Sequence, residues 1–282
     1  MILVTGATGN VGRELVHVLL YVVAKIRILV RDPARAASLP AAAHRVVGDL
    51  DQPSTLEPAF AGVRKLFLLT QGIGTAQVEN ALAAAASASV EHIVLLSSVN
   101  AIGDPVPTMG RWHRERERLL ADSGIPATVL RPGGFMTNAL EWAGTIRDGG
   151  YVFDPTGPGR FALIDPADIA AVAGLALLED GHEGRTYVPT GDEVRTLAEH
   201  VNILADVLGR EIEVRTAATP EEAVRARYPQ GATPALAAAL LEAAAAMRAD
   251  LVGFRTDEVE RLLGRRPGTF AQWCARNADA FR

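Results

Sequence analysis

The chain has 282 residues, of which 49% are hydrophobic and 22% charged, so it can bury a core of ordinary size. This composition excludes a disordered segment, a collagen-like repeat and a small domain that depends on disulfides. The formal net charge is −5 and no run of lysines or arginines occurs, so we expect no nucleic-acid partner. The single cysteine, Cys274, excludes an internal disulfide and a cysteine-based zinc site, which fits a reducing compartment.

The apolar stretches of the chain are short. No basic, cleavable leader precedes the apolar strand that opens the sequence, and the stretch from Val16 to Ala24 is shorter than a membrane span and contains His17. We therefore expect a cytoplasmic protein with no membrane partner.

Short apolar strands alternate with helices through the first half of the chain. The predicted strands are Ile2–Thr5, Ile26–Val30, His44–Val47, Leu66–Leu69, Ile93–Leu96 and Thr128–Leu130. The predicted helices between them are Asn10–Leu20, Pro53–Phe60, Thr75–Ala88 and Arg111–Ala121. Ser54 and Asp165 each precede an acidic residue by three positions, which predicts helix N-caps. The alternation predicts an α/β fold, a Rossmann-type doubly wound parallel sheet with right-handed crossovers.

The pattern loosens after Arg131. Glycines and prolines interrupt residues 149–159, a strand and a helix return at Phe161–Leu178, and the remainder is mostly helical apart from a strand at Glu211–Arg215. Thr219, with Glu222 three residues later, predicts the start of a further helix. We expect a core formed by residues 1–131 and rejoined by about 160–190. A smaller, mostly helical C-terminal region, about 132–159 and 191–282, should close over the open edge of the sheet.

A glycine-rich loop lies between the first strand and the first helix. Gly6, Gly9 and Gly12 are spaced by three, which allows a sharp turn, a close approach to a pyrophosphate and tight packing of helix on strand. The helix N-terminus adds free N–H groups and a partial positive charge. The loop predicts dinucleotide binding by the core, with contacts from these glycines and from Thr8, Asn10 and Val11; the alternative is a plain glycine turn.

The residue at the end of the second strand indicates whether NAD(H) or NADP(H) is bound. An acidic residue about 20 positions past the glycines would favour NAD(H), because it binds the ribose 2′-hydroxyl. Arg31 stands there instead, and a guanidinium suits a 2′-phosphate, so the sequence favours NADP(H) over NAD(H). The alternative is that Arg31 is a solvated loop residue and Asp32 contacts the ribose.

Seven segments, in their order and spacing, carry a family resemblance: MILVTGATGNVG, LVRDPARA, VVGDL, the SS after the fifth strand, RWHRERERLLADSGIPATVLRPGGFM, DPADIAAVA and GHEGRTYVPTG. The chain resembles the NmrA-like atypical short-chain dehydrogenases, most closely the NAD(P)H:quinone oxidoreductase type. The resemblance implies that further residues line the cofactor: Asp49 and Leu50 beside the adenine, Thr70 and Ser97 along its length, and Pro132, Gly133 and Phe135 near the nicotinamide. The alternative for Asp49 is a helix or turn cap.

Ordinary short-chain dehydrogenases protonate their product with a Tyr-x-x-x-Lys pair. The pattern occurs here as Tyr21 and Lys25, but before the second strand, on the wrong edge of the sheet for a ligand. By the resemblance, His113 falls where related reductases place a catalytic lysine, and a histidine could donate a proton near neutral pH. The alternative is a surface or capping histidine. The charges from Arg114 to Arg118 alternate in sign and predict a solvated, ion-paired face.

Aromatic and apolar residues gather just past the sixth strand. They could wall a flat aromatic pocket, with core packing as the alternative for at least half of them. The candidate substrate residues are Phe135, Met136, Asn138, Trp142 and Phe153, with Tyr151 beside them.

A nicotinamide site without a strong acid suits a quinone, because reduction of a quinone gives a stabilised anion. We therefore expect an NAD(P)H-dependent oxidoreductase acting on a quinone or a similar small aromatic, without metal or flavin. The resemblance also implies a place in aromatic polyketide (antibiotic) tailoring, where a quinol supports O₂-dependent hydroxylation, and a homodimer or a partner enzyme. Two alternatives remain: a non-enzymatic NAD(P) sensor that binds a regulator, and a non-redox isomerase or cyclase.

Overall fold

The structure is a computed structural model that describes residues 1–23, 25–227, 231 and 233–282. This part of the chain forms two compact units. The first comprises Met1–Ile102, Gly110–Pro132 and Pro166–Pro189, and the second comprises Gly103–Met109, Gly133–Asp165 and Thr190–Arg282. The sequence placed all of residues 1–131 in the first unit, whereas the structure assigns the short segment 103–109 to the second.

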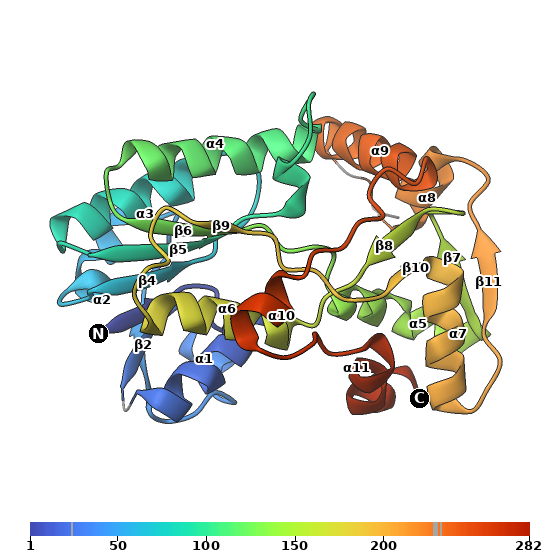
Figure 1. Ribbon diagram of the computed structural model, residues 1–282, viewed down its shortest axis with the longest axis horizontal. Helices are drawn as coiled ribbons and strands as arrows, with labels where there is room; N and C mark the ends of the chain where they lie inside the picture. Colours follow the sequence, from blue (N-terminus) through green and yellow to red (C-terminus); the bar gives the residue numbers. More distant parts are fainter. Residues whose placement is uncertain (24, 228–230, 232) are drawn as a thin grey trace. The chain divides into compact units, whose positions relative to one another are not determined.

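The first unit is built on a seven-stranded parallel sheet (Figure 1). Its order is β3-β2-β1-β4-β5-β6-β9, with Val4 of β1 opposite Ile28 of β2 and Phe67 of β4. The strands are β1 (Ile2–Val4), β2 (Ile26–Val30), β3 (Ala43–Val47), β4 (Lys65–Leu68), β5 (His92–Leu96), β6 (Ala127–Leu130) and β9 (Thr186–Tyr187). The strand order reverses between β1 and β4, so the predicted doubly wound Rossmann-type sheet is confirmed. The two-residue β9 was not predicted.

Helices cover both faces of this sheet (Figure 1). On one face α1 (Asn10–Val22) packs against α6 (Pro166–Leu178). On the other lie α2 (Glu57–Phe60), α3 (Ala76–Ser87) and α4 (Thr108–Asp122). Short 3₁₀ turns, η1 (Pro33–Ala36), η2 (Pro53–Thr55) and η3 (Val99–Ala101), follow β2, β3 and β5.

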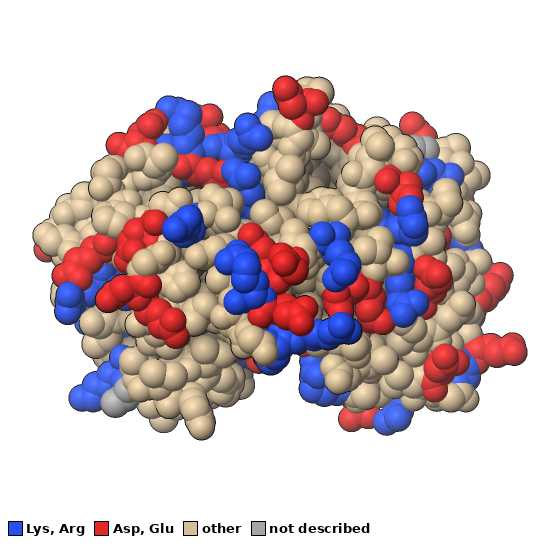
Figure 2. Space-filling view, viewed as in Figure 1, with Lys and Arg blue, Asp and Glu red and all other residues tan. Residues whose placement is uncertain are grey.

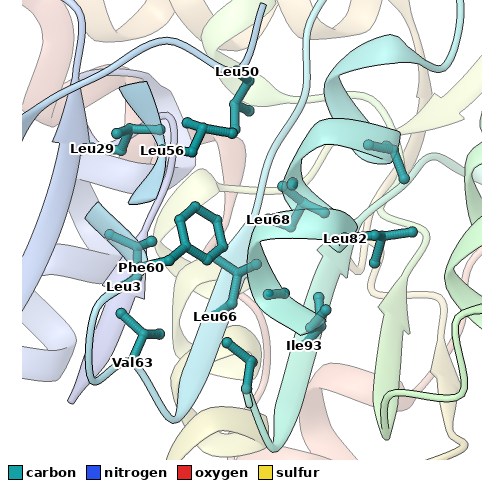
Figure 3. Close-up of a cluster of buried hydrophobic side chains, with 14 of the residues drawn as sticks. Leu3, Leu29, Leu50, Leu56, Phe60, Val63, Leu66, Leu68, Leu82 and Ile93 are labelled. Carbon is teal, nitrogen blue, oxygen red and sulfur yellow. The ribbon is translucent and has the colours of Figure 1, made fainter. Parts of the chain in front are cut away.

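The core beneath α2 and α3 explains why the sequences of the strands are continuous apolar runs. Leu3, Leu66 and Ile93 project from three neighbouring strands toward Phe60 of α2 and Leu82 of α3 (Figure 3). A strand with helices on both faces buries every side chain, so its sequence has no polar alternation. Full burial of side chains of this size contributes roughly 1.5–3 kcal/mol each.

The predicted helix Pro53–Phe60 is not continuous. It is divided into η2 and α2, and Ser54 caps neither. Thr55, the last residue of η2, makes the side-chain bonds here: its Oγ1 donates to the carbonyl oxygens of Gln52 (2.7 Å) and Asp49 (3.3 Å) and accepts from the Asp49 N–H (2.9 Å). These bonds tie the turn back to the end of β3.

The second unit has its own core and two small sheets. In the sheets, β7 (Tyr151–Asp154) pairs in parallel with β11 (Glu213–Thr216), and β8 (Arg160–Ala162) pairs antiparallel with β10 (Val194–Thr196). The helical elements are η4 (Met136–Trp142), α5 (Ala143–Gly149), α7 (Leu197–Leu208), α8 (Pro220–Arg227), α9 (Pro234–Arg248), α10 (Glu258–Leu263), α11 (Phe270–Asn277) and η5 (Ala278–Phe281). The start of α8 was predicted, and Thr219 Oγ1 accepts the Glu222 N–H there (3.2 Å).

None of the helices in the described part of the chain has the length and apolarity needed to cross a membrane. On the face shown in Figure 2, the acidic and basic side chains are interspersed.

Candidate functional site

The seven parallel strands place all their carboxyl ends at one edge of the sheet. Six loops that leave this edge carry predicted cofactor residues of the first unit: Gly6–Gly12 after β1, Arg31 after β2, Asp49 and Leu50 after β3, Thr70 after β4, Ser97 after β5 and Pro132 after β6. Ligands of open α/β sheets bind at this edge, near the point where the strand order reverses. We call it the cofactor edge.

The glycine loop after β1 is closed tightly. Gly6 has φ +60°, a region that favours glycine, and a Cβ on Gly12 would lie 2.2 Å from the Gly6 carbonyl oxygen. The buried Thr5 anchors the loop, because its Oγ1 accepts the Leu69 N–H (2.7 Å) and donates to the Leu69 carbonyl (3.0 Å). Gly9, the N-cap of α1, has no side chain that could cap the helix, and the partial positive charge of a helix N-terminus favours an anion.

The other loop residues have different surroundings. Thr8 is half-buried and Asn10 is exposed, whereas the Val11 side chain is buried in the core. Val11 can therefore reach a ligand only through its backbone.

Arg31 is exposed at the carboxyl end of β2, and no ion pair or hydrogen bond of its side chain is found among the described residues. The neighbouring Asp32 is engaged elsewhere, because its Oδ1 accepts the Ala34 N–H (2.9 Å) and caps η1. Arg45 holds the segment after η1, donating to carbonyl oxygens that include Ala36 (2.9 Å) and Leu39 (2.6 Å). The loop after β2 thus presents the Arg31 guanidinium to solvent, whereas the neighbouring Asp32 carboxylate is already hydrogen-bonded within the loop.

Asp49 and Leu50 form the turn after β3. Asp49 Oδ1 accepts the Asp51 N–H (3.1 Å), so the turn-cap role left open from the sequence is present, and one carboxylate oxygen remains. The Leu50 side chain is buried in the core, and its carbonyl accepts from Asn80 Nδ2 (2.8 Å).

Thr70 follows β4, and its Oγ1 is buried without a hydrogen-bond partner in the described residues. The loop beyond it is held by Arg116 of α4, whose Nε donates to the Gly74 carbonyl (2.9 Å) and whose second nitrogen donates to the Gly72 carbonyl (2.5 Å). Arg116 is only 5% exposed. The prediction of a solvated face from Arg114 to Arg118 is therefore wrong for Arg116, because its guanidinium completes a loop of the cofactor edge.

Glu117, the next residue of α4, is also directed inward. Its Oε1 accepts from the Ser97 hydroxyl at the end of β5, and Arg131 at the end of β6 donates to both carboxylate oxygens (2.9 and 2.5 Å). Arg118, in contrast, stays exposed and pairs with Glu115 and Asp122, as the sequence predicted.

His113 lies one helical turn before Glu117 and is half-buried. Burial and, to a smaller extent, the positive charge of Arg116 lower its pKa to about 4, although the Glu117 carboxylate partly opposes both. At pH 7 roughly one molecule in a thousand would carry the imidazolium. A charged imidazolium at neutral pH does not fit these surroundings, whereas a neutral imidazole N–H can still donate a hydrogen bond. The proton-donor role of His113 stays a prediction.

The Tyr-x-x-x-Lys pattern lies away from the cofactor edge. Tyr21 is 94% exposed in the last turn of α1, and Lys25 is exposed just before β2 begins. Lys65 is the first residue of β4, at the same amino edge of the sheet.

The predicted residues beyond Pro132 belong to the second unit. Gly133 passes close to other backbone, since a Cβ there would lie 3.1 Å from the Ala162 carbonyl oxygen. Phe135 is half-buried and bridges to Ile164, and Asn138 is exposed.

The predicted aromatic and apolar substrate residues have different surroundings in the described part of the chain. Met136 is 2% exposed and Trp142 packs on the same core, edge to face with Phe270, so the core-packing alternative describes both. Tyr151 is covered by the guanidinium of Arg215, 3.8 Å from its ring centre. Phe153 does line a cavity, of about 560 Å³, together with Thr219, Glu222 and Arg225.

The family model described as NAD(P)H-binding matches residues 6–180, which include the glycine loop and the loops that follow β2 to β6. The chain belongs to this NAD(P)H-binding family.

Similar proteins agree with the predicted family resemblance. A NAD(P)H azoreductase of Xenophilus azovorans is 37% identical over 284 residues, covering 100% of this chain and 99% of that protein. A (4-alkanoyl-5-oxo-2,5-dihydrofuran-3-yl)methyl phosphate reductase of Streptomyces griseus subsp. griseus is 39% identical, with 100% and 99% coverage. The solved NADPH-dependent quinone oxidoreductase of Escherichia coli, in complex with NADPH, has a TM-score of 0.84 at 29% identity and covers 98% and 99% of the two chains.

Two features of the cofactor edge fit a bound dinucleotide. The backbone at Gly6 and Gly12 is packed so closely that a side chain on Gly12 would not fit. A backbone without side chains at these positions is what a closely bound pyrophosphate requires. The unpartnered Thr70 Oγ1 is a buried polar atom of the kind that a ligand satisfies.

Proposed function

We propose that this protein is an NADPH-dependent reductase of quinones and related conjugated acceptors such as azo compounds. One observation carries the proposal: neither His113 nor Glu117, two titratable side chains of α4 that point inward, is placed as a strong proton donor at neutral pH. Burial lowers the pKa of His113 to about 4, and both carboxylate oxygens of Glu117 accept hydrogen bonds from Arg131.

This lack of a strong acid limits the substrates. Hydride addition to an aliphatic ketone gives an alkoxide, which needs a strong proton donor in the transition state. Hydride addition to a quinone or an azo group gives a delocalised anion, which takes its proton from water or a weak donor. The relatives named as azo and quinone reductases act on acceptors of this second kind.

Different residues of the cofactor edge bind different parts of the cofactor. A bound nicotinamide supplies the hydride. The glycine loop and the N-terminus of α1 hold the pyrophosphate, and Arg31 binds the 2′-phosphate by a charge-assisted contact. Asp32, which would favour a free 2′-hydroxyl, already caps η1. These contacts support NADPH over NADH.

The second unit is the proposed substrate region, with Phe135 and Phe153 as its candidate aromatic contacts. A role in polyketide tailoring with O₂-dependent hydroxylation is a prediction of the family resemblance that the chemistry above does not require. Cytoplasmic location and a homodimeric state are predictions of the same kind.

The test measures NADPH consumption at 340 nm under nitrogen with a naphthoquinone, an azo dye and an aliphatic ketone. We expect turnover with the first two and none with the ketone, and a lower KM for NADPH than for NADH. A Tyr21→Phe variant is the matched control and should turn over at the wild-type rate, because Tyr21 lies at the opposite edge of the sheet. Ketone reduction as fast as quinone reduction would mean that the site holds an acid after all. Tight NADPH binding without any turnover would favour a sensor.

A further inference from the structure

Three charged or polar residues from three elements form one hydrogen-bonded unit at the cofactor edge. Ser97 follows β5, Glu117 lies on α4 and Arg131 follows β6. Backbone bonds place both strand ends: the Ser97 N–H donates to the Leu130 carbonyl (2.7 Å), and the Arg131 N–H donates to the Tyr187 carbonyl (2.7 Å). The sheet therefore fixes the backbone positions of Ser97 and Arg131.

Glu117 and Arg131 form a largely buried, two-point ion pair. The guanidinium donates to both carboxylate oxygens, and the two side chains are only 21% and 10% exposed. Such two-point, charge-assisted pairs are stronger than single neutral hydrogen bonds, and their planar geometry fixes the carboxylate. Glu117 at this position can only accept hydrogen bonds.

An ionised Glu117 determines the direction of the Ser97 hydroxyl. The carboxylate has no proton to give, so the single hydroxyl proton of Ser97 must point to Glu117 Oε1. The remaining lone pairs of Ser97 Oγ are left for another partner. Ser97 is 7% exposed, so it can offer one acceptor position at the cofactor edge and no donor.

The place of Ser97 in the sheet identifies the partner's chemistry. The strand order reverses between β1 and β4, with the glycine loop and Arg31 on the β1–β2 side. A dinucleotide in a doubly wound fold lies across that point, so its second nucleoside, the nicotinamide half, lies over the ends of β4, β5 and β6. Ser97 belongs to that side. The nicotinamide ring carries one kind of hydrogen-bond donor, the N–H of its carboxamide. The other donors of this nucleoside are the ribose hydroxyls, which are the same in both cofactors of the test below.

We propose that Ser97 accepts a hydrogen bond from the carboxamide N–H of the bound nicotinamide, and that Glu117, held by Arg131, is the positioning residue that makes Ser97 an acceptor. The inference rests on the proposed function, since it requires NADP(H) at this edge. It assigns Ser97 to the orientation of the nicotinamide ring and excludes it as the proton source for the reduced substrate.

The test is equilibrium binding by calorimetry of two oxidised cofactors, NADP⁺ and its 3-acetylpyridine analogue, in which a methyl ketone replaces the carboxamide and no N–H remains. Wild type should bind NADP⁺ about three- to tenfold more tightly than the analogue, the range of one neutral hydrogen bond. Ser97→Ala should bind both with equal affinity. Ser98→Ala is the matched control: this neighbouring hydroxyl accepts the Asn100 N–H (3.2 Å), and its loss should leave the discrimination intact.

The Glu117→Gln variant distinguishes a role of Glu117 in orienting the Ser97 hydroxyl from a role only in the stability of the fold. The amide keeps the shape of Glu117 but orients the hydroxyl less strictly, so the discrimination should fall below the wild-type ratio while the variant remains folded by circular dichroism. Wild-type discrimination in Ser97→Ala would overturn the contact, and wild-type discrimination in Glu117→Gln would overturn the positioning role. If Glu117→Gln does not fold, the two serine variants still decide the contact. Failure of wild type to bind either cofactor would instead refute the proposed function.

Discussion

Arg31 is the residue on which cofactor selectivity depends in this account. It is exposed, and its neighbour Asp32 uses a carboxylate oxygen to cap η1. Arg31→Ala should weaken NADPH binding by about 1.5–3 kcal/mol, roughly 10- to 150-fold, and leave NADH binding nearly unchanged, because a charge-assisted contact is lost from the 2′-phosphate alone.

Fluorescence titration with both nucleotides measures this difference. Arg64→Ala serves as the control, because Arg64 lies before β4 in an exposed pair with Glu91, and pairs of that kind contribute little to stability. Equal losses of affinity for NADPH and NADH in Arg31→Ala would show that this guanidinium does not read the 2′-phosphate.

His113 leads to a prediction about pH rather than affinity. Because burial lowers its pKa to about 4, it is neutral throughout the range from pH 6 to 9. His113→Gln should therefore keep the shape of the kcat profile over that range, with a loss of kcat smaller than the hundredfold expected for a lost general acid. A wild-type alkaline limb near pH 7 that vanishes in His113→Gln would mean that the bound complex raises the pKa and that His113 is the acid.

The charged residues of α4 show what the sequence could and could not reveal at this scale. Alternating signs correctly predict the exposed Glu115–Arg118 pair. His113, Arg116, Glu117 and Leu120 nevertheless recur at helical spacing, and this pattern of one shared face was the signal that they point inward. What Arg116 and Glu117 would contact could not be predicted, because their partners lie in loops after β4, β5 and β6.

At the scale of elements, the contact between α1 and α6 depends on a glycine. A Cβ on Gly174 of α6 would lie 2.6 Å from Val18 Cγ1 of α1. A β-branched valine in a helix has essentially one side-chain rotamer, so it cannot turn away. Gly174→Ala should reduce the free energy of unfolding by about 1–3 kcal/mol.

Urea denaturation checks this prediction against a second helical glycine. Gly144 of α5 has no atom within 4 Å of its would-be Cβ, so Gly144→Ala should be neutral or stabilising by up to about 1 kcal/mol. Adding Val18→Ala to Gly174→Ala should restore part of the loss. Similar effects of the two glycine substitutions would refute the close packing.

The elements themselves were predictable where burial and local sequence agree. β2 has the predicted bounds, and α1 begins at the predicted Asn10, since a continuous apolar run and a glycine turn determine each locally. β9 and β7 were missed because each depends on a distant partner, β6 and β11 respectively. The predicted Ser54 cap failed because Thr55 makes the bonds to the end of β3 instead.

At the scale of the whole molecule, buried histidines should make stability depend on pH. His200 is 1% exposed among Phe161 and Phe270, and its Nδ1 donates to the Thr196 carbonyl (2.9 Å). Burial lowers its pKa to about 4, and burial also lowers the pKa of His92. Because the folded-state pKa lies below the unfolded value, the stabilisation is complete above about pH 6.5 and is lost as the pH falls toward 4.

The loss attributable to His200 is about 3 kcal/mol across that window. Urea denaturation of wild type and His200→Gln at pH 7, 5 and 4 measures it, with the exposed His44 replaced by Gln as the control. His200→Gln should be less stable at pH 7 but lose less stability on acidification. Parallel losses in the two proteins would show that His200 does not titrate with folding.

The sequence was most informative about the first unit and least about the second. The predicted cofactor residues follow a repeated strand–loop–helix order. Gly6 and Arg31 could therefore be placed at strand ends from the sequence, whereas Ser97 was assigned by the family resemblance. The aromatic residues of the second unit follow no such order. Whether Met136 packs in a core or Phe153 lines a cavity depends on β11 and α8, about 60 or more residues away in the chain.

The central claim is that this protein transfers a hydride from NADPH to a conjugated acceptor without an acid of its own. Single-turnover oxidation of NADPH by a naphthoquinone under nitrogen, followed at 340 nm with unlabelled and 4-deuterated cofactor, tests it most directly. We predict stoichiometric loss of absorbance, a primary isotope effect, and a rate of the chemical step that is constant from pH 6 to 9. A rate that falls with a single ionisation in that range would contradict the claim, because it would reveal a protein acid at the site.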